Sequence, residues 1–237
     1  LKGNWYFIRA QLFEGENNFA YAIKDYNKLM ELYDISYKSS ILYYRAKCYA
    51  DAGMYENAIS DFSESLSIDS TDAYTFGYRA DVKRLTGDYA SAVEDFTRAI
   101  NLEPREEWFY YRRGWTKEFM QDFDGALIDY NEAISINKEY IYTYLNRGRL
   151  FESKLNNTAK AKEDYLTILS LDTVAEAEGN CRQYALFHLG RNEEAIEWMN
   201  KIIKLYPTNG NYYEATCLYS LMNKPKEAIS YLNLAFQ

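Results

Sequence analysis

Histidine, cysteine and proline are scarce in this sequence. His188 is the only histidine, which argues against a Ser-His or Cys-His catalytic pair and against a metal site with several histidines. Cys48, Cys181 and Cys217 are odd in number and far apart, which argues against a disulfide framework or a zinc knuckle. We therefore expect reduced, buried thiols and a packing role for His188.

Positive charge and long apolar runs are also in short supply. There are 27 Lys and Arg against 35 Asp and Glu, a formal net charge of −8 that disfavours nucleic acid as a partner. No run approaches the roughly 18–20 apolar residues of a membrane helix, so we expect no membrane insertion. No glycine-rich phosphate loop, HExxH or GxSxG motif occurs. We expect no cofactor, no metal and no enzymatic activity.

A repeated pattern fills the sequence. One alanine recurs at intervals of 33 to 36 residues, as Ala22, Ala58, Ala92, Ala126, Ala161, Ala195 and Ala228. A large apolar residue follows four positions later in each copy, as Tyr26, Phe62, Phe96, Tyr130, Tyr165, Met199 and Leu232. This spacing is that of one helix face. A small residue, such as Ala46 or Ala80, lies twelve positions before the alanine in a second helical segment, so each copy is predicted to be an antiparallel helix pair.

This pattern resembles the tetratricopeptide repeat, whose unit has 34 residues. Residues 73–106 carry the matching side chains Phe76, Ala80, Tyr89, Ala92, Phe96, Ala99 and Pro104. The resemblance implies an all-α fold, a right-handed α-solenoid (superhelix) of about seven helix-turn-helix repeats in a single domain over residues 1–237. The repeats are expected at about 3–36, 39–72, 73–106, 107–140, 141–175, 176–208 and 209–237.

The repeats are unequal. Repeat 1 is expected to have a longer exit loop, and repeat 5 a one-residue insertion in "KLNNTAK". In repeat 6, Gly179 and Gln183 replace an aromatic and a small residue. The last helix places Leu232 and Phe236 where another layer would pack. We expect a truncation, an absent capping helix or a partner there, including self-association through this uncapped C-terminal repeat.

A charged pair recurs with the same period. An arginine occupies the seventh place of six repeats and an aspartate the twenty-third place of five. In an antiparallel hairpin these places face each other, which predicts a structural ladder of ion pairs. Its members are Arg9 with Asp25, Arg45 with Asp61, Arg79 with Asp95, Arg113 with Asp129, and Arg147 with Asp164. Arg112 is outside this period and is the better functional candidate, while Arg182 keeps the arginine but has Trp198 in the aspartate's place.

The resemblance also implies a concave groove lined by the first helices. The expected lining is Phe7, Tyr43, Lys47, Tyr74, Asp81, Arg84, Trp108, Tyr111, Trp115, Phe119, Tyr142, Leu145, Arg149, Glu152, Tyr184 and Phe187. Aromatic and basic residues of this wall, together with Arg112, are candidates for binding a protein or peptide. They are Tyr43, Lys47, Tyr74, Arg84, Trp108, Tyr111, Arg112, Trp115, Phe119, Tyr142, Arg149 and Tyr184. One subclass of the family binds the C-terminal carboxylate of its partner through an asparagine in the first helix. The corresponding places in this sequence hold Trp115 and Arg149, so we do not expect that arrangement here.

Two functions fit these observations. The first is a non-catalytic scaffold that binds a peptide or helical segment of a partner protein in the aromatic groove. The alternative is the substrate-recruiting arm of a larger enzyme, such as a glycosyltransferase or a protease. The sequence does not assign a cellular compartment. A cytoplasmic location is favoured, but the sequence starts at Leu1 without a methionine, so a preceding signal segment and a periplasmic or secreted location are also compatible with it.

Overall fold

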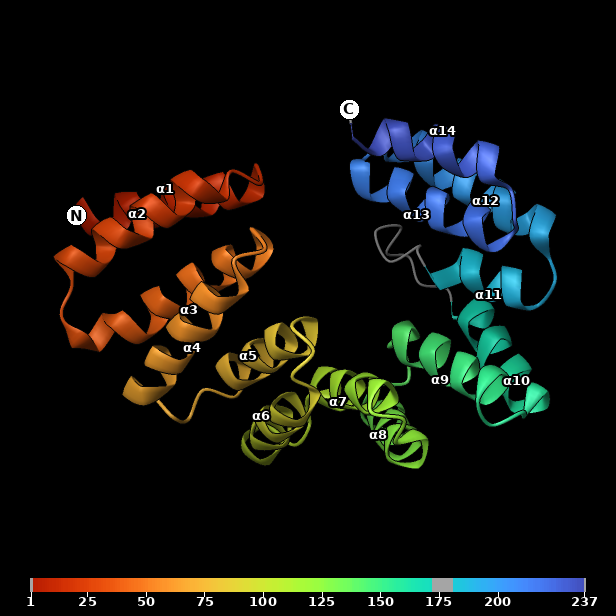
Figure 1. Ribbon diagram of the computed structural model, residues 1–237, viewed down its shortest axis with the longest axis horizontal. Helices are drawn as coiled ribbons and strands as arrows, with labels where there is room; N and C mark the ends of the chain where they lie inside the picture. Colours follow the sequence, from red (N-terminus) through yellow and green to blue (C-terminus); the bar gives the residue numbers. More distant parts are fainter. Residues whose placement is uncertain (1, 172–180, 237) are drawn as a thin grey trace. The chain divides into compact units, whose positions relative to one another are not determined.

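The computed structural model describes residues 2–171 and 181–236, and within these ranges every regular element is an α-helix (Figure 1). This confirms the expected all-α helical-repeat solenoid. In chain order the helices are α1 (Lys2–Gly15), α2 (Phe19–Leu32), α3 (Ile35–Asp51), α4 (Tyr55–Ile68), α5 (Ala73–Leu85), α6 (Tyr89–Leu102), α7 (Glu107–Phe119), α8 (Phe123–Ile136), α9 (Ile141–Ser153), α10 (Thr158–Ser170), α11 (Arg182–His188), α12 (Asn192–Leu205), α13 (Asn209–Leu221) and α14 (Pro225–Ala235).

The odd-numbered helices are the first and the even-numbered helices the second members of the predicted pairs. Two differences from the expected boundaries occur. The extra residues after repeat 1 are part of α3, which begins at Ile35, so they extend a helix rather than a loop. In repeat 6 the described part of the first helix begins at Arg182. Gly179 lies outside the described residues, and Gln183 is buried on α11 despite its size.

A residue with positive φ follows the first helix of each pair, in the turn to the second helix. Glycine takes this place at Gly53, Gly87 and Gly190, with φ of 74°, 86° and 74°. In the other pairs the residue is Asn17, Gln121, Asn156 or Asn223. Glycine and asparagine tolerate this left-handed conformation best, because a larger side chain meets the following carbonyl there. The turn sequences therefore fix where the chain reverses.

The recurring alanines and aromatic residues form the core. The seven alanines that define the period are at most 5% exposed. Tyr26, Phe62, Phe96 and Tyr130 are fully buried one helical turn later. The small residue of the first helix lets these rings approach: at Gly148 an added Cβ would lie 2.7 Å from Cε1 of Tyr165. Close packing of this kind is what a stack of helix pairs requires.

Contacts between Cα atoms divide the chain into two compact units, Leu1–Asp129 and Tyr130–Gln237. Unit 1 contains α1 to α7 and the first half of α8, and unit 2 contains the remainder. The single domain over residues 1–237 stays a prediction. Among the described residues, no helix combines the length and the hydropathy needed to span a lipid bilayer.

Candidate partner-binding surface

The five predicted arginine–aspartate pairs are all in contact. In each pair, Nε and Nη2 of the arginine donate to the two carboxylate oxygens at 2.6–3.0 Å. The five aspartates are at most 6% exposed. Two-point contact with a buried carboxylate is the strong form of this interaction, and it leaves these arginines engaged within the scaffold. Arg113, in the sequence YYRRGW at residues 110–115, is one of them.

A second link of the same arginines was missed by sequence reasoning. Their Nη1 atoms donate to a polar side chain of the preceding repeat: Arg45 to Asn27, Arg79 to Ser63, Arg113 to Thr97 and Arg147 to Asn131, at 2.6–3.0 Å. Each acceptor lies two residues after the aspartate of its own repeat. This polar residue recurs at a fixed place in the sequence, so the link between repeats could have been predicted from it. Each arginine thus joins its own hairpin to the previous one.

The pKa values of two ladder aspartates, Asp95 and Asp164, are shifted in opposite directions. Burial raises the pKa of Asp95, but hydrogen bonds from Arg79 and Lys83 outweigh it, and the pKa lies below the ordinary 3.8. Burial also raises the pKa of Asp164, where Arg147 is the only cation in contact among the described residues, and there burial prevails. Asp95 thus has a lysine in addition to its arginine, whereas Asp164 has the arginine alone within the described part of the chain.

These opposite shifts predict opposite responses to acid. Asp95, with a lowered pKa in the folded state, contributes stability that is lost as the pH falls through that pKa. Asp164, with a raised pKa, contributes stability at low pH that is lost as the pH rises through its folded pKa. In urea unfolding between about pH 3 and pH 7, Asp95→Asn should therefore reduce the loss of stability in acid, and Asp164→Asn should increase it. Parallel stability curves for both variants would contradict this.

Arg182 of repeat 6 has a different environment. Its Nη1 donates to the carbonyl oxygen of Leu169 at 3.3 Å, and its guanidinium lies 5.0 Å from the ring centroid of Trp198. The cation–π contact with Trp198 occupies the place of the ion pair. A pocket of about 330 Å³ lies beside it, lined also by Arg191, Glu194 and Lys201. Arg191 is engaged there with Glu194.

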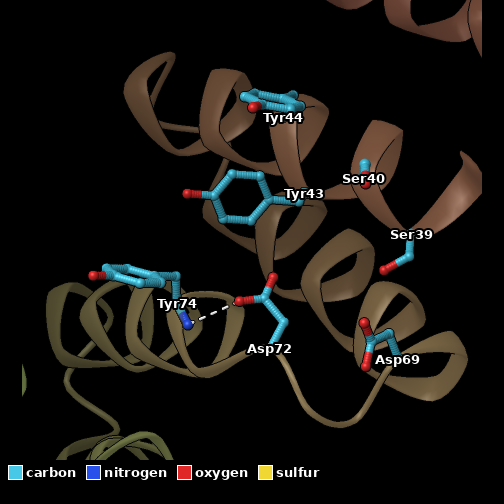
Figure 2. A pocket seen from close by; sticks show the side chains of 7 residues that line it. All are labelled: Ser39, Ser40, Tyr43, Tyr44, Asp69, Asp72 and Tyr74. Atoms are coloured by element: carbon cyan, nitrogen blue, oxygen red, sulfur yellow. Dashed lines mark hydrogen bonds between the residues drawn. The ribbon is translucent and has the colours of Figure 1, made fainter. Parts of the chain in front are cut away.

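The first-helix surface of unit 1 begins at a pocket of about 330 Å³ between α3 and α5 (Figure 2). Figure 2 shows the Tyr43 ring at its centre, with Asp72 and Tyr74 below it. The carboxylates of this pocket serve the local turns: Asp69 accepts from Thr71, and Asp72 accepts from the backbone of Tyr74 at 2.9 Å. Both carboxylates are therefore engaged locally, Asp69 in the loop before α5 and Asp72 at the N-cap of α5.

An aromatic row extends from this pocket along α3, α5 and α7. We define it as Tyr43, Tyr78, Trp108, Trp115 and Phe119. The Tyr43 and Tyr78 centroids are 5.7 Å apart, and those of Tyr78 and Trp108 are 5.1 Å apart. Lys47 lies over the Tyr43 and Tyr78 rings, and Phe119, 47% exposed, stacks on Tyr89. Tyr78 was not among the predicted lining residues. It occupies the same place in its repeat as Arg112, which was singled out as a candidate, and this shared place was a signal that could have identified Tyr78.

At the α7 end of the row, two arginines flank one tryptophan. The guanidinium carbon of Arg84 is 4.1 Å from the Trp115 centroid, and that of Arg112 is 5.3 Å from it. Both arginines contact the same carboxylate: Asp81 accepts from Nη2 of Arg84 at 2.9 Å and from Nη1 of Arg112 at 3.4 Å. We call Asp81, Arg84, Arg112 and Trp115 the arginine–tryptophan cluster.

Burial changes the roles of three predicted lining residues. Tyr111 and Arg84 are each 7% exposed, because neighbouring rings cover them. Trp108 packs against the core formed by Phe96 and Phe109 and is only partly exposed.

Tyr74, another predicted lining residue, is 44% exposed. It donates its hydroxyl to Glu106 at 2.6 Å, a hydrogen bond that raises the pKa of Tyr74 to about 12.

The predicted lining residues of unit 2 form a sparser surface. Tyr142 is half-buried, Arg149 is exposed, and Tyr184 donates its hydroxyl to Glu214 at 2.6 Å. Nearby, Nδ1 of His188 is 2.8 Å from an oxygen of Glu152 that also accepts from Tyr165. Burial lowers the pKa of His188, so the imidazole is neutral at pH 7 and donates to Glu152. Within residues 2–171 and 181–236, no three potential ligands cluster in a way that could hold a metal ion.

Solved structures of low sequence identity share this fold. The crystal structure of MamA is 23% identical and covers 69% of this chain and 94% of that chain, with a TM-score of 0.62. A tetratricopeptide repeat protein from Parabacteroides merdae ATCC 43184 is 14% identical and covers 99% of both chains, with a TM-score of 0.66. The C-terminal part of a repeat-containing protein from Cytophaga hutchinsonii is 18% identical over 97% of this chain and 93% of that chain, with a TM-score of 0.61. These likenesses concern the fold alone.

No curated protein sequence matches the chain significantly. The sequence profile of the tetratricopeptide repeat matches residues 39–72, 79–106, 109–140, 141–173 and 184–209. These segments fall on the helix pairs from α3 to α12 and together make up more than half of the chain. Proteins built from this repeat bind other proteins, and the fold is typically non-catalytic. The chain belongs to the tetratricopeptide repeat family and is a protein-interaction scaffold.

Proposed function

We propose that this scaffold binds an extended or helical segment of a partner protein on the first-helix surface of unit 1, centred on Trp115. The observation that carries the proposal is the aromatic row on α3, α5 and α7. Its rings adjoin from Tyr43 through Tyr78 to Trp108 and again from Trp115 to Phe119, and the Arg112 guanidinium lies over both tryptophans. Amphipathic rings held in fixed positions bury apolar area at little entropic cost, which is why they dominate peptide-binding surfaces.

The chemistry of the row supports a protein rather than a nucleic acid. Lys47, Arg84 and Arg112 each lie over rings of the row, so the local surface offers both apolar area and positive charge. The chain as a whole carries a formal charge of −8, which repels a phosphate backbone. A peptide presents few charges and many apolar groups, and it suits such a mixed surface better.

The test starts with a randomised peptide library selected against residues 1–237. Peptides that bind are then titrated by fluorescence anisotropy against Trp115→Ala and Phe119→Ala. Each variant should weaken binding about tenfold or more, because Trp115→Ala removes a half-buried ring and Phe119→Ala an exposed ring from the proposed contact. Trp108→Ala is a poorer test, since Trp108 also packs on the core.

Tyr37→Ala is the matched control for this experiment. Tyr37 is 59% exposed and lies in the first turn of α3, away from the aromatic row. Its replacement should leave the affinity unchanged, and circular dichroism should show equal helicity for all variants. Equal affinities of the Trp115, Phe119 and Tyr37 variants would reject the proposed surface.

We also propose self-association through the C-terminal repeat. Phe236 and Ile229 are 82% and 59% exposed on and next to α14. In repeats 2 and 3 the residues equivalent to Phe236, Leu66 and Ile100, are each 7% exposed because the next repeat covers them. Sedimentation velocity of residues 1–237 should show association that grows with concentration and is reduced by Phe236→Ser. A monomer at all concentrations would contradict it.

A further inference from the structure

The arginine–tryptophan cluster carries more positive charge than its own carboxylate can neutralise. Arg84 and Arg112 each carry a positive charge, and Asp81 is the only acidic residue within ion-pair distance of either among the described residues. The cluster therefore has two positive charges against one negative charge. This excess is local, since the chain as a whole is acidic.

The hydrogen-bond donors of Arg112 are largely unused. A guanidinium has five N–H donors, and the only one of Arg112 with an acceptor in the described structure is on Nη1, 3.4 Å from Asp81. Nε of Arg112 is buried without an acceptor. The ladder arginines, by contrast, each place two nitrogens on an aspartate and most place a third on the preceding repeat. Arg112 is thus a partly buried arginine that has donors available for a further acceptor.

The aromatic rings hold this guanidinium in place. Its carbon lies 5.8, 5.7 and 5.3 Å from the centroids of Trp108, Tyr111 and Trp115. Its side chain is 25% exposed, so a partner can reach it. A guanidinium fixed in this way loses little conformational freedom when it binds an acceptor, and its fork matches the two oxygens of a carboxylate.

We propose that Arg112, supported by Arg84 and Trp115, binds a carboxylate of the partner segment, next to an apolar side chain that contacts Trp115 and Phe119. This inference rests on the proposed function. The carboxylate belongs to an Asp or Glu side chain or to the C-terminus of the partner. The arrangement uses two arginines and a tryptophan, and it has no asparagine of the kind used by the terminal-carboxylate subclass.

Asp81 sets the strength of this interaction. Its shared carboxylate holds both guanidiniums and competes with the carboxylate of the partner. Removing this charge should therefore strengthen binding, whereas removing the charge of Arg112 should weaken it. Opposite effects from two neighbouring residues separate recognition of charge from general damage to the fold.

Three peptide pools provide the test, all of random sequence and equal length. The first contains Asp and Glu and ends in an amide, the second lacks Asp and Glu and has a free C-terminal carboxylate, and the third lacks both. Immobilised residues 1–237 should retain the first or the second pool about tenfold more than the third. The pool that is retained identifies the source of the carboxylate.

Variants assign this preference to the cluster. Arg112→Gln should abolish it, and Asp81→Asn should increase it severalfold. Arg105→Gln, which makes the same charge change at an exposed residue between α6 and α7, should leave it unchanged. Added salt should reduce the preference of the wild type, because the attraction is electrostatic. If Arg112→Gln does not fold, the Asp81→Asn and salt results alone decide the matter.

Three outcomes would count against the inference. Equal retention of the three pools, with loss of all of them in Trp115→Ala, would reject carboxylate recognition and still support the proposed function. A carboxylate preference that survives Arg112→Gln in a folded variant would place the recognition elsewhere. Retention of no pool by the wild type would count against the proposed function and the inference together.

Discussion

Asp95→Ala is expected to lower the free energy of unfolding by about 3–5 kcal/mol, the largest effect that we predict for a single residue. Asp95 is 2% exposed and accepts from Arg79 and from Lys83 at 2.7–2.8 Å. Its removal leaves two poorly hydrated cations, 11% and 18% exposed, without their carboxylate. Urea unfolding at neutral pH measures the change.

A double-mutant cycle separates the pair from its surroundings. Arg79→Ala together with Asp95→Ala should cost clearly less than the sum of the single variants, since the double variant leaves fewer buried charges unpaired. Glu94→Ala is the matched control, because Glu94 is an exposed acid next to Asp95 on α6, and it should change stability by less than about 0.5 kcal/mol. Additive single effects would mean that Arg79 and Asp95 do not depend on each other.

Gly77→Ala is expected to lower the free energy of unfolding by about 1–3 kcal/mol. A Cβ at this place in α5 would lie 2.6 Å from the rings of both Trp108 and Phe109. Phe109 is fully buried and Trp108 packs on the same core, so one or both rings must shift to admit the added methyl group. Because Trp108 also belongs to the aromatic row, the same variant should weaken peptide binding on that surface.

Gly15→Ala is the control for this prediction. Gly15 ends α1, and an added Cβ would have no atom within 4 Å. The unfolded chain loses freedom when alanine replaces glycine, so this variant should leave stability unchanged or raise it by up to about 1 kcal/mol. If Gly77→Ala and Gly15→Ala behave alike, the close approach of Trp108 and Phe109 to α5 does not limit stability.

Much of the fold and part of the candidate site were predictable from one periodic pattern. The same place in each repeat predicted that Arg113 pairs with Asp129 and that Arg112 stands apart, and both residues lie accordingly. The Nη1 links to the preceding repeat were missed, although their polar acceptors recur. The burial of Tyr111 and Arg84 had no signal in the sequence, because exposure depends on which neighbouring ring covers a side chain.

The sequence by itself determined the helix pairs, their turns and the ladder, because these features depend on residue types that recur at the spacing of one helical hairpin. Only the tertiary structure decided which members of the aromatic wall stay accessible. It packed Trp108 onto the core, left Phe119 exposed, and brought Arg84 and Arg112 from different repeats onto Trp115 with a single shared carboxylate. The physical reason is that the charge balance of this cluster arises from side chains of adjacent repeats, whose contacts depend on how those repeats stack.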